Sequence, residues 1–122
     1  MIRFYTREFF EELTRRLNED GPWKRSVAEV RLRFVCSAAD KRASFLLEID
    51  RGRIRASEAK PDTPADYRFE GAYDAWMRLC KGEYEFDRAI ETGKIRVAGL
   101  LPPLMGPLNH IVVTARSFPK EF

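Results

Sequence analysis

Apolar side chains recur at helical spacing near the start of the chain. Positions three or four apart are occupied by Phe9, Phe10, Leu13 and Leu17. This spacing predicts an amphipathic helix, and Thr6 is suited to be its N-cap. Gly21-Pro22 is expected to end this helix, because proline cannot continue one.

The period then changes to two. Apolar and polar residues alternate over 29–36, 44–50 and 54–58, which predicts three half-buried strands. Short polar turns separate the stretches, so consecutive strands are expected to pair as an antiparallel meander. A loop at 60–64 precedes a brief fourth strand at 66–70.

The second half returns mostly to helical spacing. It predicts helices over 72–81, 85–92 and about 103–116, with a strand at 94–98 between the last two. Gly82 and Gly93 suit helix ends, whereas Pro107 is expected to kink or delay the final helix.

Composition limits the class of protein. The chain has 122 residues, of which 44% are hydrophobic and 34% charged, so one globular domain over 1–122 is expected rather than a disordered segment. No apolar run reaches the roughly 18 residues of a membrane span. The termini show neither a secretory signal nor a peroxisomal address, so a cytoplasmic location is expected. The net charge of +3 permits weak, transient contact with an anionic membrane surface.

The residue types that carry chemistry are sparse. Cys36 and Cys80 lie far apart and His110 is the single histidine, so neither a metal site nor a bound cofactor is expected. His110 is better explained as a solvated or hydrogen-bonded group at the edge of the last helix than as a general base. The sequence has no phosphate-binding glycine loop, and glutamates stand where the segment 81–86 would need stacking aromatics to bind nucleic acid.

Three consecutive stretches carry a family resemblance. They are Ala65-Asp66 through Gly71, then Trp76 through Gly82, and then Arg88 through Gly99, which includes Gly93-Lys94. In this order they resemble the sterol carrier protein type 2 family. The resemblance implies an α+β fold with a mixed, mostly antiparallel five-stranded sheet covered by helices and an apolar tunnel between them. It also implies a non-enzymatic carrier of a sterol, fatty acid, acyl-CoA or isoprenoid lipid. The segment 100–107 departs from the family pattern, which leaves the shape of the tunnel mouth open.

Candidate ligand contacts follow from this resemblance and from the late apolar stripes. The expected apolar lining is Phe69, Trp76, Met77, Phe86, Ile90, Leu104, Met105, Leu108 and Ile111. Arg78 and Lys81 are candidates to hold a lipid headgroup. Trp76 is the best single candidate for a cavity wall, and methionine is an adaptable lining for an irregular ligand.

Each of these apolar residues could instead fill a core. Two alternatives to a lipid carrier therefore stay open. One is an interaction module with a filled core, which would bind a partner protein or form a homodimer. The other is an enzyme acting on a bound lipid, which is disfavoured because no acid–base pair or activated nucleophile is evident.

Overall fold

The computed structural model describes residues 1–98 and 104–122. Helices and strands alternate in the order α1 (Arg7–Asn18), α2 (Gly21–Ser26), β1 (Arg31–Ala38), a short 3-10 turn (Ala39–Lys41), β2 (Ala43–Asp50), β3 (Arg53–Ala59), β4 (Tyr67–Gly71), α3 (Tyr73–Cys80), α4 (Phe86–Glu91), β5 (Ile95–Ala98) and α5 (Met105–Arg116). Every helix and strand predicted from the pattern is present, with ends shifted by a few residues.

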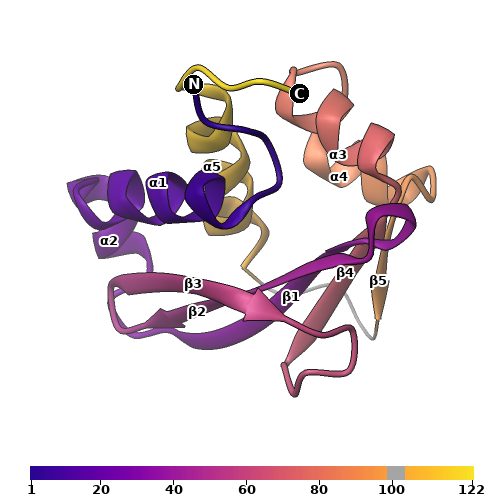
Figure 1. The fold of residues 1–122 in the computed structure, drawn as a ribbon. Coiled ribbons are helices and arrows are strands. Elements are labelled where there is room, and N and C mark those ends of the chain that lie inside the picture. Colours follow the sequence, from indigo (N-terminus) through magenta and orange to yellow (C-terminus); the bar gives the residue numbers. More distant parts are fainter. Residues whose placement is uncertain (99–103) are drawn as a thin grey trace.

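The described strands form one five-stranded sheet in the order β3-β2-β1-β4-β5 (Figure 1). β1 and β4 run parallel, whereas the other neighbouring pairs are antiparallel, as expected for a mixed sheet. Asp66 fixes the start of β4 against β1: its backbone N–H donates to the Arg33 carbonyl at 2.8 Å, and its carboxylate accepts from the Arg33 N–H at 2.8 Å.

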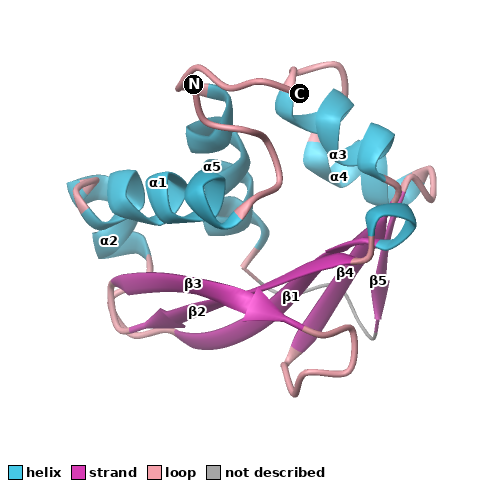
Figure 2. Cartoon of the chain, in the orientation of Figure 1, coloured by secondary structure: helices cyan, strands magenta, loops and turns pink. Residues whose placement is uncertain are grey.

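The described helices all lie on one side of the sheet (Figure 2). The alternating strand residues that face them, such as Phe34, Leu47 and Phe69, join the apolar faces of the helices in one core. The opposite face of the sheet carries the charged residues of the alternation. This two-layer arrangement confirms the predicted α+β class. Among residues 1–98 and 104–122, none of the helices combines the length and the hydropathy of a membrane span.

The region after the first helix differs from the prediction. Thr6 caps α1 as expected, by accepting from the Phe9 N–H. Gly21-Pro22 follows the end of α1, but it has a second role that was not predicted. It opens a second short helix, α2, which Asp20 caps by accepting from the Trp23 N–H at 3.1 Å. Proline is compatible with a first turn because the N–H groups there need no partner within the helix.

The same principle explains Pro107. It is the third residue of α5, within the first turn, so it neither kinks the helix nor interrupts its hydrogen bonds. The Trp23 indole donates to the Pro107 carbonyl at 3.1 Å, which fixes α2 against the start of α5. The predicted start of this helix at Pro102-Pro103 lies outside the described residues.

Candidate functional site

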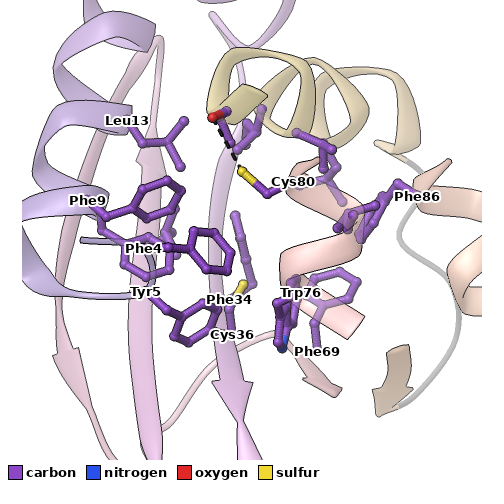
Figure 3. Close-up of a pocket in the computed structure, with 17 residues that line it drawn as sticks. Phe4, Tyr5, Phe9, Leu13, Phe34, Cys36, Phe69, Trp76, Cys80 and Phe86 are labelled. Carbon is purple, nitrogen blue, oxygen red and sulfur yellow. Dashed lines mark hydrogen bonds between the residues drawn. The ribbon is translucent and has the colours of Figure 1, made fainter. Parts of the chain in front are cut away.

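A small cavity lies between the helix-facing side of the sheet and helices α1, α3 and α5 (Figure 3). Its volume is about 80 Å³. Of its lining residues, all but Val112 are buried. They are Phe4, Tyr5, Phe9, Phe10, Leu13, Phe34, Cys36, Leu47, Phe69, Trp76, Leu79, Cys80, Phe86, Leu108, Ile111, Val112 and Ala115.

Aromatic rings make up much of the wall. Phe4 packs edge-on against Phe9 with 4.9 Å between ring centroids, and Phe69 lies 5.9 Å from Phe34 and 5.5 Å from Phe86. Such pairs hold large side chains in defined positions. The wall therefore combines the N-terminal segment, the central strands and the later helices in one apolar surface.

Few polar atoms belong to the lining side chains, and most of them are already satisfied. The Trp76 indole N–H donates to the Ser37 carbonyl at 2.9 Å, and the Cys80 thiol donates to the Ala115 carbonyl at 3.5 Å. Burial raises the pKa of the Cys36 thiol to about 12. The cysteines are free and buried, so the thiols are neutral elements of the wall rather than nucleophiles.

Tyr5 is the exception. Within residues 1–98 and 104–122, its hydroxyl oxygen is the one buried side-chain nitrogen or oxygen that has no hydrogen-bond partner. Burial, and secondarily the Cys36 thiol, raise the pKa of Tyr5 well above its ordinary value. Its backbone is also unusual, with φ of 60°, a left-handed conformation that is strained for a bulky residue.

The structure brings five of the predicted lining residues to this cavity: Phe69, Trp76, Phe86, Leu108 and Ile111. The other four, Met77, Ile90, Leu104 and Met105, are half-buried and pack against the core without lining the cavity. Their role in ligand binding, like that of the five cavity residues, stays a prediction.

The two predicted headgroup residues lie at the surface. Arg78 pairs with Asp74 at 2.8 Å and with Glu83 at 2.9 Å, so carboxylates already balance its charge. Lys81 has its ammonium 5.0 Å from the centre of the Phe122 ring, near the C-terminus. Neither lines the cavity.

The most important lining residues that the prediction missed are Phe4 and Tyr5. They precede the first helix, where no periodic pattern marks them as inward-facing. Phe34, Cys36 and Leu47 were also left out, although the period of two already placed them on the inward faces of their strands. That alternation was the signal that could have added them to the lining.

Catalytic chemistry gains no support from the rest of the described structure. His110 hydrogen-bonds through Nε2 to the Asp20 carboxylate at 2.8 Å, and this pair connects α5 to the N-cap of α2. The prediction of a hydrogen-bonded edge residue is thus confirmed. In the part of the chain that the structure describes, no group of three or more His, Cys, Asp or Glu residues could hold a metal ion.

Comparison with known proteins agrees with the sequence resemblance. The family model described as the SCP-2 sterol transfer family matches residues 10–102. No curated protein matches the sequence significantly. Among solved structures, a crystal structure of sterol carrier protein 2 superposes with a TM-score of 0.81 at 16% identity, covering 96% of this chain and 100% of that one.

Two further structures show the range of this fold. The apo form of sterol carrier protein 2 from Yarrowia lipolytica has a TM-score of 0.56 at 19% identity, covering 91% of this chain and 89% of that one. The inverting sec-alkylsulfatase Pisa1 from Pseudomonas sp. has a TM-score of 0.66 at 16% identity, covering 95% of this chain but 17% of the enzyme. The fold therefore occurs both alone and as a small part of a larger enzyme.

Proposed function

The chain belongs to the SCP-2 sterol transfer family, and on that premise we propose that it binds and carries one lipid-like ligand without transforming it. The observation that carries the proposal is the cavity, whose lining is almost wholly apolar and comes from both layers of the fold. Burial of apolar ligand surface supplies about 25 cal/mol per Å² removed from water, which favours a fatty-acyl, sterol or isoprenoid ligand.

The size of the cavity adds a requirement. Its volume is about 80 Å³, whereas small-molecule pockets commonly have roughly 300–1,000 Å³. A lipid therefore enters only if the helical layer moves away from the sheet. Helices α1, α3 and α5 are the elements that must move, because their side chains form the roof of the cavity.

The same small volume favours a second candidate function. A domain with a nearly filled interior can serve as an assembly module that binds a partner protein or a second copy of itself. In that case the aromatic wall is a core, and added lipids leave the protein unchanged. The binding experiment below separates the two functions.

As part of the carrier proposal, we expect transient membrane contact at the end of the molecule where the two termini meet. The Glu121 N–H donates to the Ile2 carbonyl at 2.8 Å, and Lys81 and Lys120 surround the half-exposed Phe122. Phe122 packs against Phe4, which also lines the cavity. Basic residues beside an exposed ring suit an anionic lipid surface.

Liposome flotation tests this contact. Wild-type protein should float with vesicles that contain phosphatidylserine and remain behind with neutral vesicles. Replacing Lys81 and Lys120 with glutamate should abolish flotation and leave the thermal midpoint unchanged. Equal flotation of the variant would contradict this placement.

The free, buried cysteines accord with our proposal of a cytoplasmic location, which stays a prediction.

The first test of lipid carriage is native mass spectrometry of the gently purified protein, followed by a titration with fatty acids, fatty alcohols and sterols. A matched pair of variants on α5 shows where the ligand binds. Ala115→Leu adds volume inside the cavity, whereas Val113→Leu adds it to a position that is 51% exposed.

We expect stoichiometric lipid uptake by wild type and Val113→Leu, and loss of uptake in a folded Ala115→Leu variant. Equal binding by both variants would place the ligand elsewhere. If wild-type protein takes up no lipid from the panel, the assembly function replaces the carrier function.

A further inference from the structure

Among the buried side-chain nitrogen and oxygen atoms of the described residues, the hydroxyl oxygen of Tyr5 alone has no hydrogen-bond partner, and Tyr5 is one of the residues that line the cavity. The Trp76 indole N–H and the Cys80 thiol already donate to backbone carbonyls, and the Cys36 thiol is only a weak donor. Tyr5 is 7% exposed and its hydroxyl oxygen meets no partner in the described residues. Buried polar groups are nearly always hydrogen-bonded, so this exception needs an explanation.

The position of this hydroxyl is fixed by packing. The Tyr5 ring lies 5.2 Å from Phe10, 5.7 Å from Phe45 and 5.7 Å from Trp76, measured between ring centroids. Figure 3 shows Tyr5 among the lining residues, near Cys36 and Trp76. In the described arrangement of the helices, rings on several sides prevent the side chain from swinging out to water.

The backbone is fixed as well. Thr6, the next residue, donates its hydroxyl to the Arg3 carbonyl at 2.6 Å and accepts from the Phe9 N–H. This closed turn holds Tyr5 at φ of 60°, in a conformation that aromatic residues rarely adopt. Strained backbone of this kind clusters at ligand sites, and here it coincides with a buried hydroxyl that has no protein partner in the described residues.

We propose that the Tyr5 hydroxyl donates a hydrogen bond to a single neutral oxygen, an alcohol or a carbonyl, on the buried end of the ligand. This inference rests on the proposed carrier function and narrows its ligand class. The ligand enters with its oxygen first, and its hydrocarbon part contacts the phenylalanine rings of the cavity.

The cavity favours a neutral oxygen over a carboxylate. Among its described lining residues there is no lysine, arginine or histidine, so a buried anion would lack a counter-charge. Burial also raises the pKa of Tyr5 and of Cys36, which shows that this environment disfavours negative charge. A trapped water is a poor substitute partner, because an ordered water needs two to four polar neighbours.

The test compares Tyr5→Phe with Tyr73→Phe. Tyr73 is the matched control because its ring contacts Phe4 at 5.7 Å but does not line the cavity. Three probes of equal chain length are titrated at pH 8: 1-decanol, decane and ionised decanoate. Binding is followed by NMR through the Trp76 indole signal.

We expect Tyr5→Phe to weaken 1-decanol binding about tenfold, the value of one buried hydrogen bond, and to leave decane binding within about twofold. Tyr73→Phe should bind all three probes as wild type does. The thermal midpoint of Tyr5→Phe should equal or exceed that of wild type, because the variant removes an unsatisfied hydroxyl. In wild-type protein, nuclear Overhauser contacts should connect the hydroxymethylene protons of decanol to the Tyr5 ring.

Several results would overturn the inference. In Tyr5→Phe, these results are an equal loss of decane and decanol binding, or decanol binding that is unchanged from wild type. In wild-type protein, they are decanoate binding more tightly than decanol and decane in a way that Tyr5→Phe weakens, or nuclear Overhauser contacts of decanol that do not involve the Tyr5 ring. In each of these cases lipid carriage itself survives, because the probes still bind. Failure of wild-type protein to bind any probe would overturn the carrier function together with this inference.

Discussion

The two faces of the sheet satisfy their polar groups in different ways. On the outer face, Arg31 pairs with Asp50 at 3.3 Å, Arg55 with Glu48 at 3.2 Å, and Arg96 with Glu70 at 2.7 Å. On the inner face, aromatic rings surround a cavity lined in part by Tyr5, whose hydroxyl has no partner among the described residues. The ion pairs of the outer face are exposed and exchange easily with water, whereas the inner face is shielded from water, so its contacts are expected to contribute more to the free energy of unfolding.

The chemical isolation of the inner face should be visible in thiol reactivity. With a pKa raised from 9.0 to about 12, Cys36 holds roughly a thousandfold less thiolate at pH 8 than an ordinary cysteine. Iodoacetamide labelling followed by mass spectrometry should therefore modify Cys36 at least that much more slowly in native than in denatured protein. Rapid native labelling would show that the inner face opens to solvent frequently.

The packing of the inner face is tested by Phe69→Ala. This ring is 2% exposed and contacts Phe34 and Phe86, so its removal leaves a hole in the centre of the core. We expect the free energy of unfolding to fall by about 3–5 kcal/mol, measured by urea denaturation. A loss below about 1 kcal/mol would mean that the cavity walls collapse onto the vacated space and that the inner face is not rigidly packed.

A single polar contact of the cavity wall is tested by Trp76→Phe. The change removes the indole donor from the Ser37 carbonyl while it keeps an aromatic ring in the wall. We expect a loss of about 1–3 kcal/mol in the free energy of unfolding, because a buried carbonyl loses a partner. Lipid binding should weaken in parallel, whereas an unchanged denaturation midpoint would show that water replaces the indole.

The charged exterior has its own pH signature at Glu12 on α1. Hydrogen bonds from Arg15 and Arg16 lower the pKa of Glu12 from 4.5 to about 2. A lowered folded-state pKa contributes stability above the unfolded value and loses it as the carboxylate is protonated. The stability of wild type should therefore fall between about pH 4.5 and 2.

In Glu12→Gln this component of the acid slope should vanish, and the cost at neutral pH should be below about 1 kcal/mol. Thermal midpoints measured from pH 2 to 7 check both statements. Identical acid slopes for the two proteins would contradict the assigned ion pairs.

The smallest effect is expected on the outer face. Glu48→Gln removes the negative charge that pairs with Arg33 at 3.7 Å and with Arg55 at 3.2 Å, and both ion pairs lie at the surface. The free energy of unfolding should fall by less than about 0.5 kcal/mol, and by less still at high salt. Urea denaturation at two salt concentrations measures this change in the free energy of unfolding. A destabilisation as large as that of Phe69→Ala would show that the two faces contribute equally to stability.

Local patterns predicted much of the structure. The period of two in the strands and the spacing of Phe9, Leu13 and Leu17 recovered the helices and strands, because side-chain direction follows directly from backbone geometry. The same reasoning missed α2, since Gly21-Pro22 is compatible both with a helix end and with a helix start. Asp20, which caps α2, was the residue that could have separated the two interpretations.

The candidate site was predicted only in part. Phe69, Trp76 and Phe86 lie in regular elements whose apolar stripes mark them, and they do line the cavity. Tyr5 lies in an irregular turn before the first helix, where no period applies. Its proposed role in ligand binding rests on a hydroxyl that has no hydrogen-bond partner in the described residues. Whether a partner is present depends on the folded environment and not on the local sequence.

The sequence by itself determined the elements, the inward and outward residues, and the family, because each depends on periodicity or on residue order. The tertiary structure decided that Tyr5, Cys36, Trp76 and Ala115 share one cavity, although they are distant along the chain. It also decided which hydrogen bonds are made and how much space remains. These outcomes depend on close packing between distant segments, where a shift of one side chain changes both volume and partners, and no local pattern encodes that balance.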